Sequence, residues 1–94
     1  MEDAAIVALY WERNQDAIEQ SRLKYGAYCM SISRNILASP EDAEECVSDT
    51  WLCAWNAMPP QRPNALRMFF AKITRNLSSS RFRRLAAKKR GGGV

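Results

Sequence analysis

The chain has 94 residues, of which 47% are hydrophobic and 26% charged, the balance of one folded domain rather than of a disordered segment. It has three cysteines without a CxxC pair and no histidine, so we expect neither a zinc site nor a disulfide framework. The expected lack of disulfides fits the reducing cytoplasm. No apolar run approaches the roughly 20 residues that span a bilayer. Acidic residues follow Met1 directly, so we expect neither a signal peptide nor contact with a membrane.

The charges are divided between the two halves of the chain. Residues 1–50 hold all ten acidic residues and four basic ones, a net charge of −6, whereas residues 51–94 hold ten basic residues and no acidic one, a net charge of +10. This division predicts that the basic half meets a polyanion, while the acidic half is either idle or meets a basic partner.

The sequence predicts an all-α fold, a compact domain of four helices, because no stretch alternates strictly between apolar and polar residues. The first predicted helix, about residues 3–13, would bury Ile6, Val7, Leu9 and Tyr10. The second starts near Asp16, and its apolar face comprises Ile18, Tyr25, Cys29, Ile32 and Ile36.

The third helix has a clear predicted start, with Ser39 as N-cap, Pro40 at the first helical position and carboxylates in the first turn. Its predicted core face comprises Ala43, Val47, Trp51, Ala54, Trp55 and Met58, and Pro59 and Pro60 end it. A fourth helix from Ala65 would bury Leu66, Phe69, Phe70, Ile73 and Leu77. Arginines replace this apolar stripe farther on, so we expect the helix to leave the domain, which spans residues 1–90, before a flexible linker over 91–94.

The opposite face of the third helix is acidic around one leucine, with Asp42, Glu45, Asp49, Leu52 and Cys53 clustered away from the core stripe. One interpretation is a solvated helix surface with a stray leucine. The other is a docking surface, on which Leu52 supplies buried area and the carboxylates select a basic partner.

The basic half favours contact with nucleic-acid phosphates over a merely solvated surface, because its cations have no acidic neighbours in sequence. These residues are Arg67, Lys72 and Arg75 on the fourth helix and Arg81, Arg83, Arg84, Lys88, Lys89 and Arg90 after it. The preceding loop holds three prolines beside Gln61, Arg62 and Asn64, as a rigid pocket for one unstacked base would require. The core spacing of Trp51, Phe69 and Phe70 makes base stacking the weaker interpretation for these rings.

Two segments resemble a known family. The run from Pro40 to Trp55 (PEDAEECVSDTWLCAW) and the run from Phe69 to Leu77 (FFAKITRNL), which precedes an arginine-rich stretch, are similar to segments of the sigma-70 family. The similarity is strongest to its compact extracytoplasmic-function group. The resemblance extends from Leu9 to Arg90 and implies the four-helix fold of sigma factor region 2.

The resemblance also implies two partners and no cofactor. One is core RNA polymerase, whose largest-subunit clamp helices would bind Glu45, Asp49 and Leu52, with Glu41 and Asp42 nearby. The other is the non-template strand of the promoter −10 element, which the domain would recognise and melt. Gln61, Arg62 and Asn64 would line a pocket for a flipped base and Asn76 would close it, while Arg67, Lys72 and Arg75, with Arg83 of the basic tail, would hold phosphates.

The sequence departs from the family pattern at two positions. Ser80 stands where the family often has aspartate, which removes an expected partner for the arginines, and Trp51 stands where phenylalanine is more common. Full members continue into a second domain that reads the −35 element, so we expect an isolated domain.

The alternative function is a helical interaction module that binds polymerase without melting DNA. Catalysis is disfavoured because the basic half has no paired carboxylates. The sequence leaves open whether an anti-sigma factor binds the domain.

Overall fold

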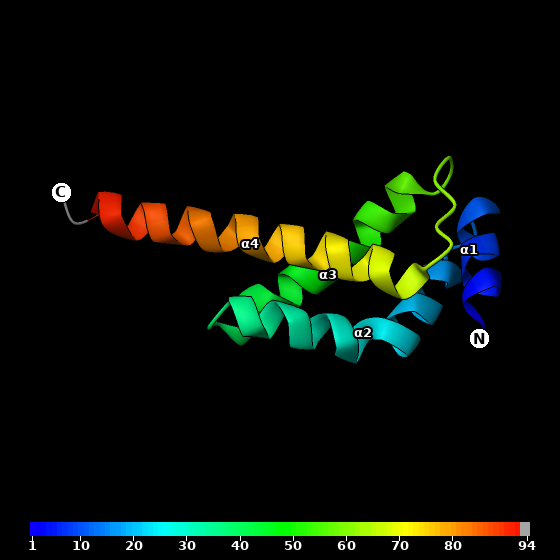
Figure 1. Cartoon of the computed structure of the whole chain (residues 1–94), viewed down its shortest axis with the longest axis horizontal. Coiled ribbons are helices and arrows are strands. Elements are labelled where there is room, and N and C mark those ends of the chain that lie inside the picture. Colours follow the sequence, from blue (N-terminus) through cyan, green and yellow to red (C-terminus); the bar gives the residue numbers. More distant parts are fainter. Residues whose placement is uncertain (93–94) are drawn as a thin grey trace.

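The computed structural model describes the backbone of residues 1–92 and the side chains of residues 1–88. Four helices, α1 (Asp3–Trp11), α2 (Asp16–Ile36), α3 (Pro40–Ala57) and α4 (Leu66–Gly92), follow one another along the chain, and no strand occurs in this described part (Figure 1). The predicted all-α fold is therefore confirmed.

Helix α3 begins where the sequence predicts. Ser39 is in extended conformation and its hydroxyl accepts a hydrogen bond from the backbone N–H of Asp42, at 3.3 Å, while Pro40 occupies the first turn. This bond satisfies one of the N–H groups that a helix start leaves without an intrahelical partner. The second predicted boundary, near Asp16, is also confirmed, whereas α1 ends at Trp11, two residues earlier than expected.

The core lies where α2, α3 and α4 meet, around the buried ring of Phe70. Trp51 of α3 packs edge-on against Phe70 with 5.2 Å between ring centroids, and Tyr25 of α2 does so at 5.6 Å. Such edge-to-face pairs are favourable beyond the apolar area that they bury. Helix α1 adds Ile6, Val7 and Tyr10 to this core, whereas Leu9 is only half-buried.

Pairs of buried hydroxyl groups join the helices. Ser33 of α2 lies 2.7 Å from Ser78 of α4, measured between the Oγ atoms, and Thr50 of α3 lies 2.9 Å from Thr74 of α4, between the Oγ1 atoms. The Tyr10 hydroxyl of α1 meets Ser21 of α2 at 2.7 Å. Each pair gives a buried polar group the partner that it needs away from water.

The predicted core face of α2 needs correction. Ile18, Ile32 and Ile36 are only half-buried. The buried stripe recurs every four residues through Ala17, Ser21, Tyr25, Cys29 and Ser33. Four of these five side chains are small, which lets the neighbouring helices pack closely against α2.

Helix α4 is the longest element and its C-terminal part extends beyond the other helices (Figure 1), in a molecule that measures 50 × 23 × 20 Å. Ser78 and Arg81 still contact α2 and α3, so α4 leaves the other helices later than Leu77. Helical backbone continues to Gly92, whereas residues 93–94 of the expected linker lie outside the described residues, so the linker over 91–94 stays a prediction.

Candidate nucleic-acid interface and acidic docking surface

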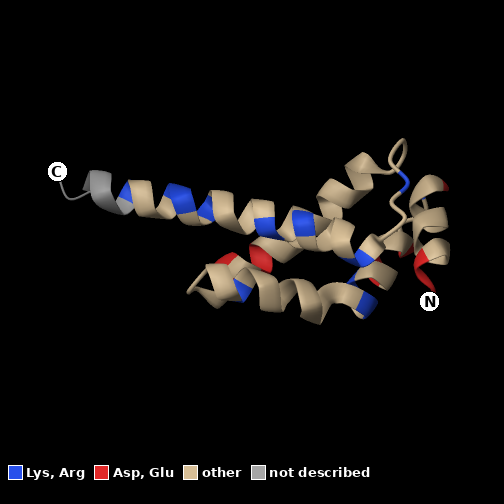
Figure 2. Ribbon diagram, viewed as in Figure 1, with Lys and Arg blue, Asp and Glu red and all other residues tan. Residues whose placement is uncertain are grey.

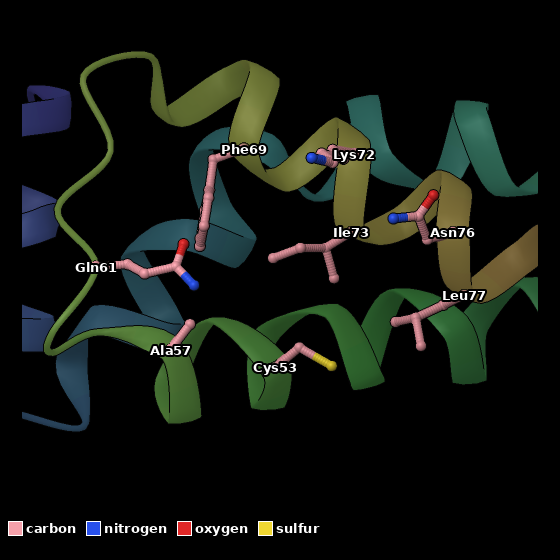
Figure 3. Close-up of a pocket in the computed structure, with 8 residues that line it drawn as sticks. All are labelled: Cys53, Ala57, Gln61, Phe69, Lys72, Ile73, Asn76 and Leu77. Carbon is pink, nitrogen blue, oxygen red and sulfur yellow. The ribbon is translucent and has the colours of Figure 1, made fainter.

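A hollow of about 400 Å³ lies between the C-terminal half of α3, the loop 58–65 and the first turns of α4 (Figure 3). We call it the α3–α4 pocket; its lining comprises Cys53, Ala57, Gln61, Phe69, Lys72, Ile73, Asn76 and Leu77. In Figure 3 the amide of Gln61 reaches from the loop toward Phe69, while Lys72 and Asn76 come from α4. The pocket thus combines an apolar floor with two amides and one ammonium group at its edge.

Lys72 and Asn76 are one helical turn apart on α4, so they project from the same side of the helix. Arg83 is two turns farther along this side and its guanidinium donates to the Ser80 hydroxyl at 3.2 Å. Ser80 therefore supplies a local partner, contrary to the expectation from the sequence. These three side chains and Arg75 are exposed, so a polyanion could follow α4 outward from the pocket.

The structure separates Arg62 and Asn64 from Gln61, although the sequence predicts one pocket for all three. Arg62 and Asn64 face the other way, where they line a smaller hollow of about 230 Å³ together with Asp3, Ala4 and Val7 of α1. The guanidinium of Arg62 lies over the ring of Trp11, 4.7 Å from its centroid. Pro63 lines this smaller hollow as well, so the loop 58–65 borders two hollows, with Gln61 at one and residues 62–64 at the other.

Arg67 is also apart from the α3–α4 pocket. Its guanidinium lies over the ring of Tyr28 on α2, 4.4 Å from the centroid. Five further residues line the pocket beside Gln61, Lys72 and Asn76 that the sequence did not point to: Cys53, Ala57, Phe69, Ile73 and Leu77. Phe69, Ile73 and Leu77 were assigned to the core, but all three are half-buried and turn one side to the pocket.

The acidic side of α3 is exposed to solvent. Glu41, Glu45 and Asp49 lie on it together with Leu52, of which 55% is exposed, and Glu44 and Ser48 line a shallow hollow there. Figure 2 shows acidic residues gathered near the start of α3 and basic residues following one another along α4. We call the residues Glu41, Glu44, Glu45, Asp49 and Leu52 the acidic surface. A hydrogen bond from its own backbone N–H, and then one from Ser39, lowers the pKa of Glu41, so this carboxylate stays charged at neutral pH.

One edge of this acidic surface is tied to α4, which the sequence did not suggest. Arg81 donates to the Asp42 carboxylate at 3.0 Å from Nε and 2.7 Å from Nη2, and to Glu45 at 2.7 Å. These bonds, first of all those to Asp42, raise the pKa of Arg81. Arg81 has no acidic neighbour in sequence, but folding brings alongside it an acidic helix that is 36 to 39 residues away in the chain.

The three cysteines are free thiols, of which Cys29 and Cys46 are buried and Cys53 is half-exposed in the pocket. Burial, and then the charge of Asp49, raises the pKa of Cys53, so this thiol is neutral at physiological pH. Among the described helices, none has both the length and the apolarity to cross a membrane.

Comparison with known proteins places this arrangement in a family. Residues 23–88 match the family described as Sigma-70 region 2, and neither a curated protein nor a solved structure gives a significant match. Region 2 of this family in general binds core RNA polymerase and recognises the promoter −10 element, as part of a transcription initiation factor that is not an enzyme. Because the match covers well over half of the sequence, the chain belongs to the sigma-70 family and carries its region 2.

Proposed function

We propose that this domain is region 2 of a sigma factor of the extracytoplasmic-function group, and that it uses its acidic and basic surfaces for two different partners. The segments Pro40–Trp55 and Phe69–Leu77 support the assignment to this group. The acidic surface binds the clamp helices of the largest polymerase subunit. The loop 58–65 and α4 bind the non-template strand of the −10 element and help to melt it.

The observation that carries the DNA part is the α3–α4 pocket at the start of a basic helix. A base that leaves the duplex loses a few kcal/mol of stacking and pairing, which the protein must offset. The half-buried ring of Phe69 offers a stacking partner, which contributes about 1–3 kcal/mol per base in comparable sites. The amides of Gln61 and Asn76 offer donors and acceptors for a base edge, while Lys72 and Arg75 reach phosphates.

The polymerase part rests on the charge and exposure of α3. Exposed carboxylates around one exposed leucine suit a partner helix with basic residues around an apolar position. The charges speed the encounter and select the partner, whereas Leu52 supplies area that becomes buried on binding. Arg81 covers Asp42 and part of Glu45, so we place Glu41 and Asp49 at the centre of this contact.

Binding to labelled single-stranded oligonucleotides, at one stated salt concentration and with each base of a candidate −10 element varied, tests the proposal. We expect the chain to prefer one base at one position by about tenfold, and Asn76→Ala to lose most of that preference. Asn64→Ala, on the other side of the loop, serves as the comparison variant and should lose less. Equal binding to all oligonucleotides would favour an interaction module that occupies polymerase without melting DNA.

A further inference from the structure

The end of α1 holds the loop 58–65 in place through two side chains, Trp11 and Arg13. The indole N–H of Trp11 donates to the backbone oxygen of Gln61 at 2.9 Å. Nη1 of Arg13 donates to the backbone oxygens of Trp55 and Met58, at 2.7 Å each. In Figure 1 the loop accordingly runs beside α1.

The guanidinium of Arg13 lies at the C-terminal end of α3, where a cation stabilises a helix. Helix α3 ends at Ala57, and the carbonyls of its last turn have no later N–H of the same helix to bind. The guanidinium occupies one of them, that of Trp55, at the negative end of the helix, together with the carbonyl of Met58 just after it, and it also lies 3.8 Å from the centroid of the Trp55 ring. One side chain therefore fixes both the end of α3 and the first residue of the loop.

The backbone conformation of Arg13 also indicates that the structure requires this side chain. Its φ is +57°, in the left-handed region, where glycine is the usual residue after a helix. A bulkier residue is strained in this region, and such strain persists where the surrounding structure requires the residue. In Arg13 the required group is the guanidinium, which donates to the backbone oxygens of Trp55 and Met58.

We propose that Trp11 and Arg13 are positioning residues for base recognition: they set the place of Gln61 and thereby the base selectivity of the α3–α4 pocket. The inference rests on the proposed function. Gln61 lines the pocket with its side chain, while its backbone oxygen is held by Trp11 and its backbone N–H donates to the oxygen of Ala57 at 2.9 Å. Both positioning residues precede residue 23, where the match to the family begins.

Two substitutions separate positioning from folding. Trp11→Phe removes the indole N–H but keeps a ring beneath Arg62. Arg13→Gly removes the guanidinium and suits the left-handed backbone, so loss of folding is not its expected effect. Arg22→Ala removes the same charge from an exposed pair with Glu19 on α2 and serves as the matched control.

The measurement is the ratio of affinities of the whole chain for two single-stranded oligonucleotides that differ only at the preferred base. We expect this ratio to fall about threefold in Trp11→Phe, the effect of one hydrogen bond, and about tenfold in Arg13→Gly. Affinity for the non-preferred oligonucleotide, helicity and the ratio in Arg22→Ala should stay within about twofold of the wild type. Faster amide hydrogen exchange at Gln61 should accompany the lost selectivity.

Two results would overturn the inference. Wild-type selectivity in both variants shows that the loop keeps its place without α1 and leaves the proposed function intact. A fall in affinity by the same factor for both oligonucleotides shows general destabilisation rather than positioning. If the wild-type chain itself lacks a base preference, the proposed function fails and this inference fails with it.

Discussion

The acidic surface and the α3–α4 pocket are built in different ways. Every residue of the acidic surface comes from α3, so the helix alone sets the spacing of the charges, and most of these side chains lie in solvent. The pocket takes its lining from α3, the loop 58–65 and α4, and the loop is held in turn by α1. Substitutions in the acidic surface should therefore act locally, whereas the pocket should respond to changes far from its lining.

The largest effect should come from the centre of the acidic surface. In Asp49→Arg combined with Leu52→Ala, we expect the affinity for core polymerase to fall about 100-fold, because one change repels a basic partner and the other removes a contact. Pull-down or surface plasmon resonance measures the affinity, and circular dichroism should show unchanged helicity. Base selectivity should not change.

A matched pair on α2 controls for charge and exposed apolar area. Asp16→Arg combined with Leu23→Ala makes the same two changes at exposed positions outside the acidic surface. Similar loss of polymerase binding in both double variants would contradict the assignment of the docking contact to α3. Loss of base selectivity in the α3 variant would contradict the independence of the two sites.

The next effect concerns the packing that places α4 behind the pocket. Ser78→Ala leaves the buried hydroxyl of Ser33 without the partner that it has at 2.7 Å. We expect the free energy of unfolding, from urea denaturation, to fall by about 1–3 kcal/mol, the usual cost of an unsatisfied buried polar group. The double variant Ser33→Ala with Ser78→Ala should recover part of this loss, and a double variant as unstable as the sum of the two single ones would rule out coupling of the two hydroxyls.

These two regions also show how much the sequence could predict. The helix count, the start of α3 and the acidic side of that helix follow from periodicity and capping, which act within one segment. The pocket could not be assembled in the same way, because its lining depends on how three segments meet. Residues such as Ser33 and Thr74 look like surface residues by polarity, although they are fully buried as hydroxyl pairs. No sequence signal marks Arg13 as the residue that holds the end of α3.

A smaller effect should appear at the edge where the two surfaces meet. Arg81→Met frees the carboxylates of Asp42 and Glu45 and makes this side of α3 more negative. We expect association with core polymerase at low salt to become about two- to threefold faster, since opposite charges steer the encounter. The free energy of unfolding should change little, because the pair is partly exposed and screened by solvent.

Arg84→Met is the matched control for Arg81→Met, because it removes the same charge from an exposed position one turn along α4. Only Arg81→Met should speed association beyond the effect of net charge. Equal acceleration in both variants would show that the ion pair with α3 does not restrain the acidic surface.

The smallest effect concerns the contact that holds the start of α1 on α2. The Tyr25 hydroxyl lies 2.8 and 2.9 Å from the two carboxylate oxygens of Asp3, to which it donates. Burial, and then this contact, raises the pKa of Tyr25 from 10.0 to about 12. Because the folded pKa lies above the unfolded one, the stabilisation is complete below about pH 10 and is lost as the pH rises toward 12.

Thermal unfolding of the wild type and of Tyr25→Phe measures this contribution. The wild type should be more stable by about 1 kcal/mol at pH 8, and the difference should disappear between about pH 10 and 12. A difference that persists at pH 12 would contradict the role of the Tyr25–Asp3 bond. Because α1 holds the loop 58–65 but contributes nothing to the acidic surface, Tyr25→Phe at pH 8 should lower base selectivity slightly and leave polymerase affinity unchanged. If Tyr25→Phe weakened base selectivity and polymerase affinity to the same extent, the pocket would depend on distant contacts no more than the acidic surface does.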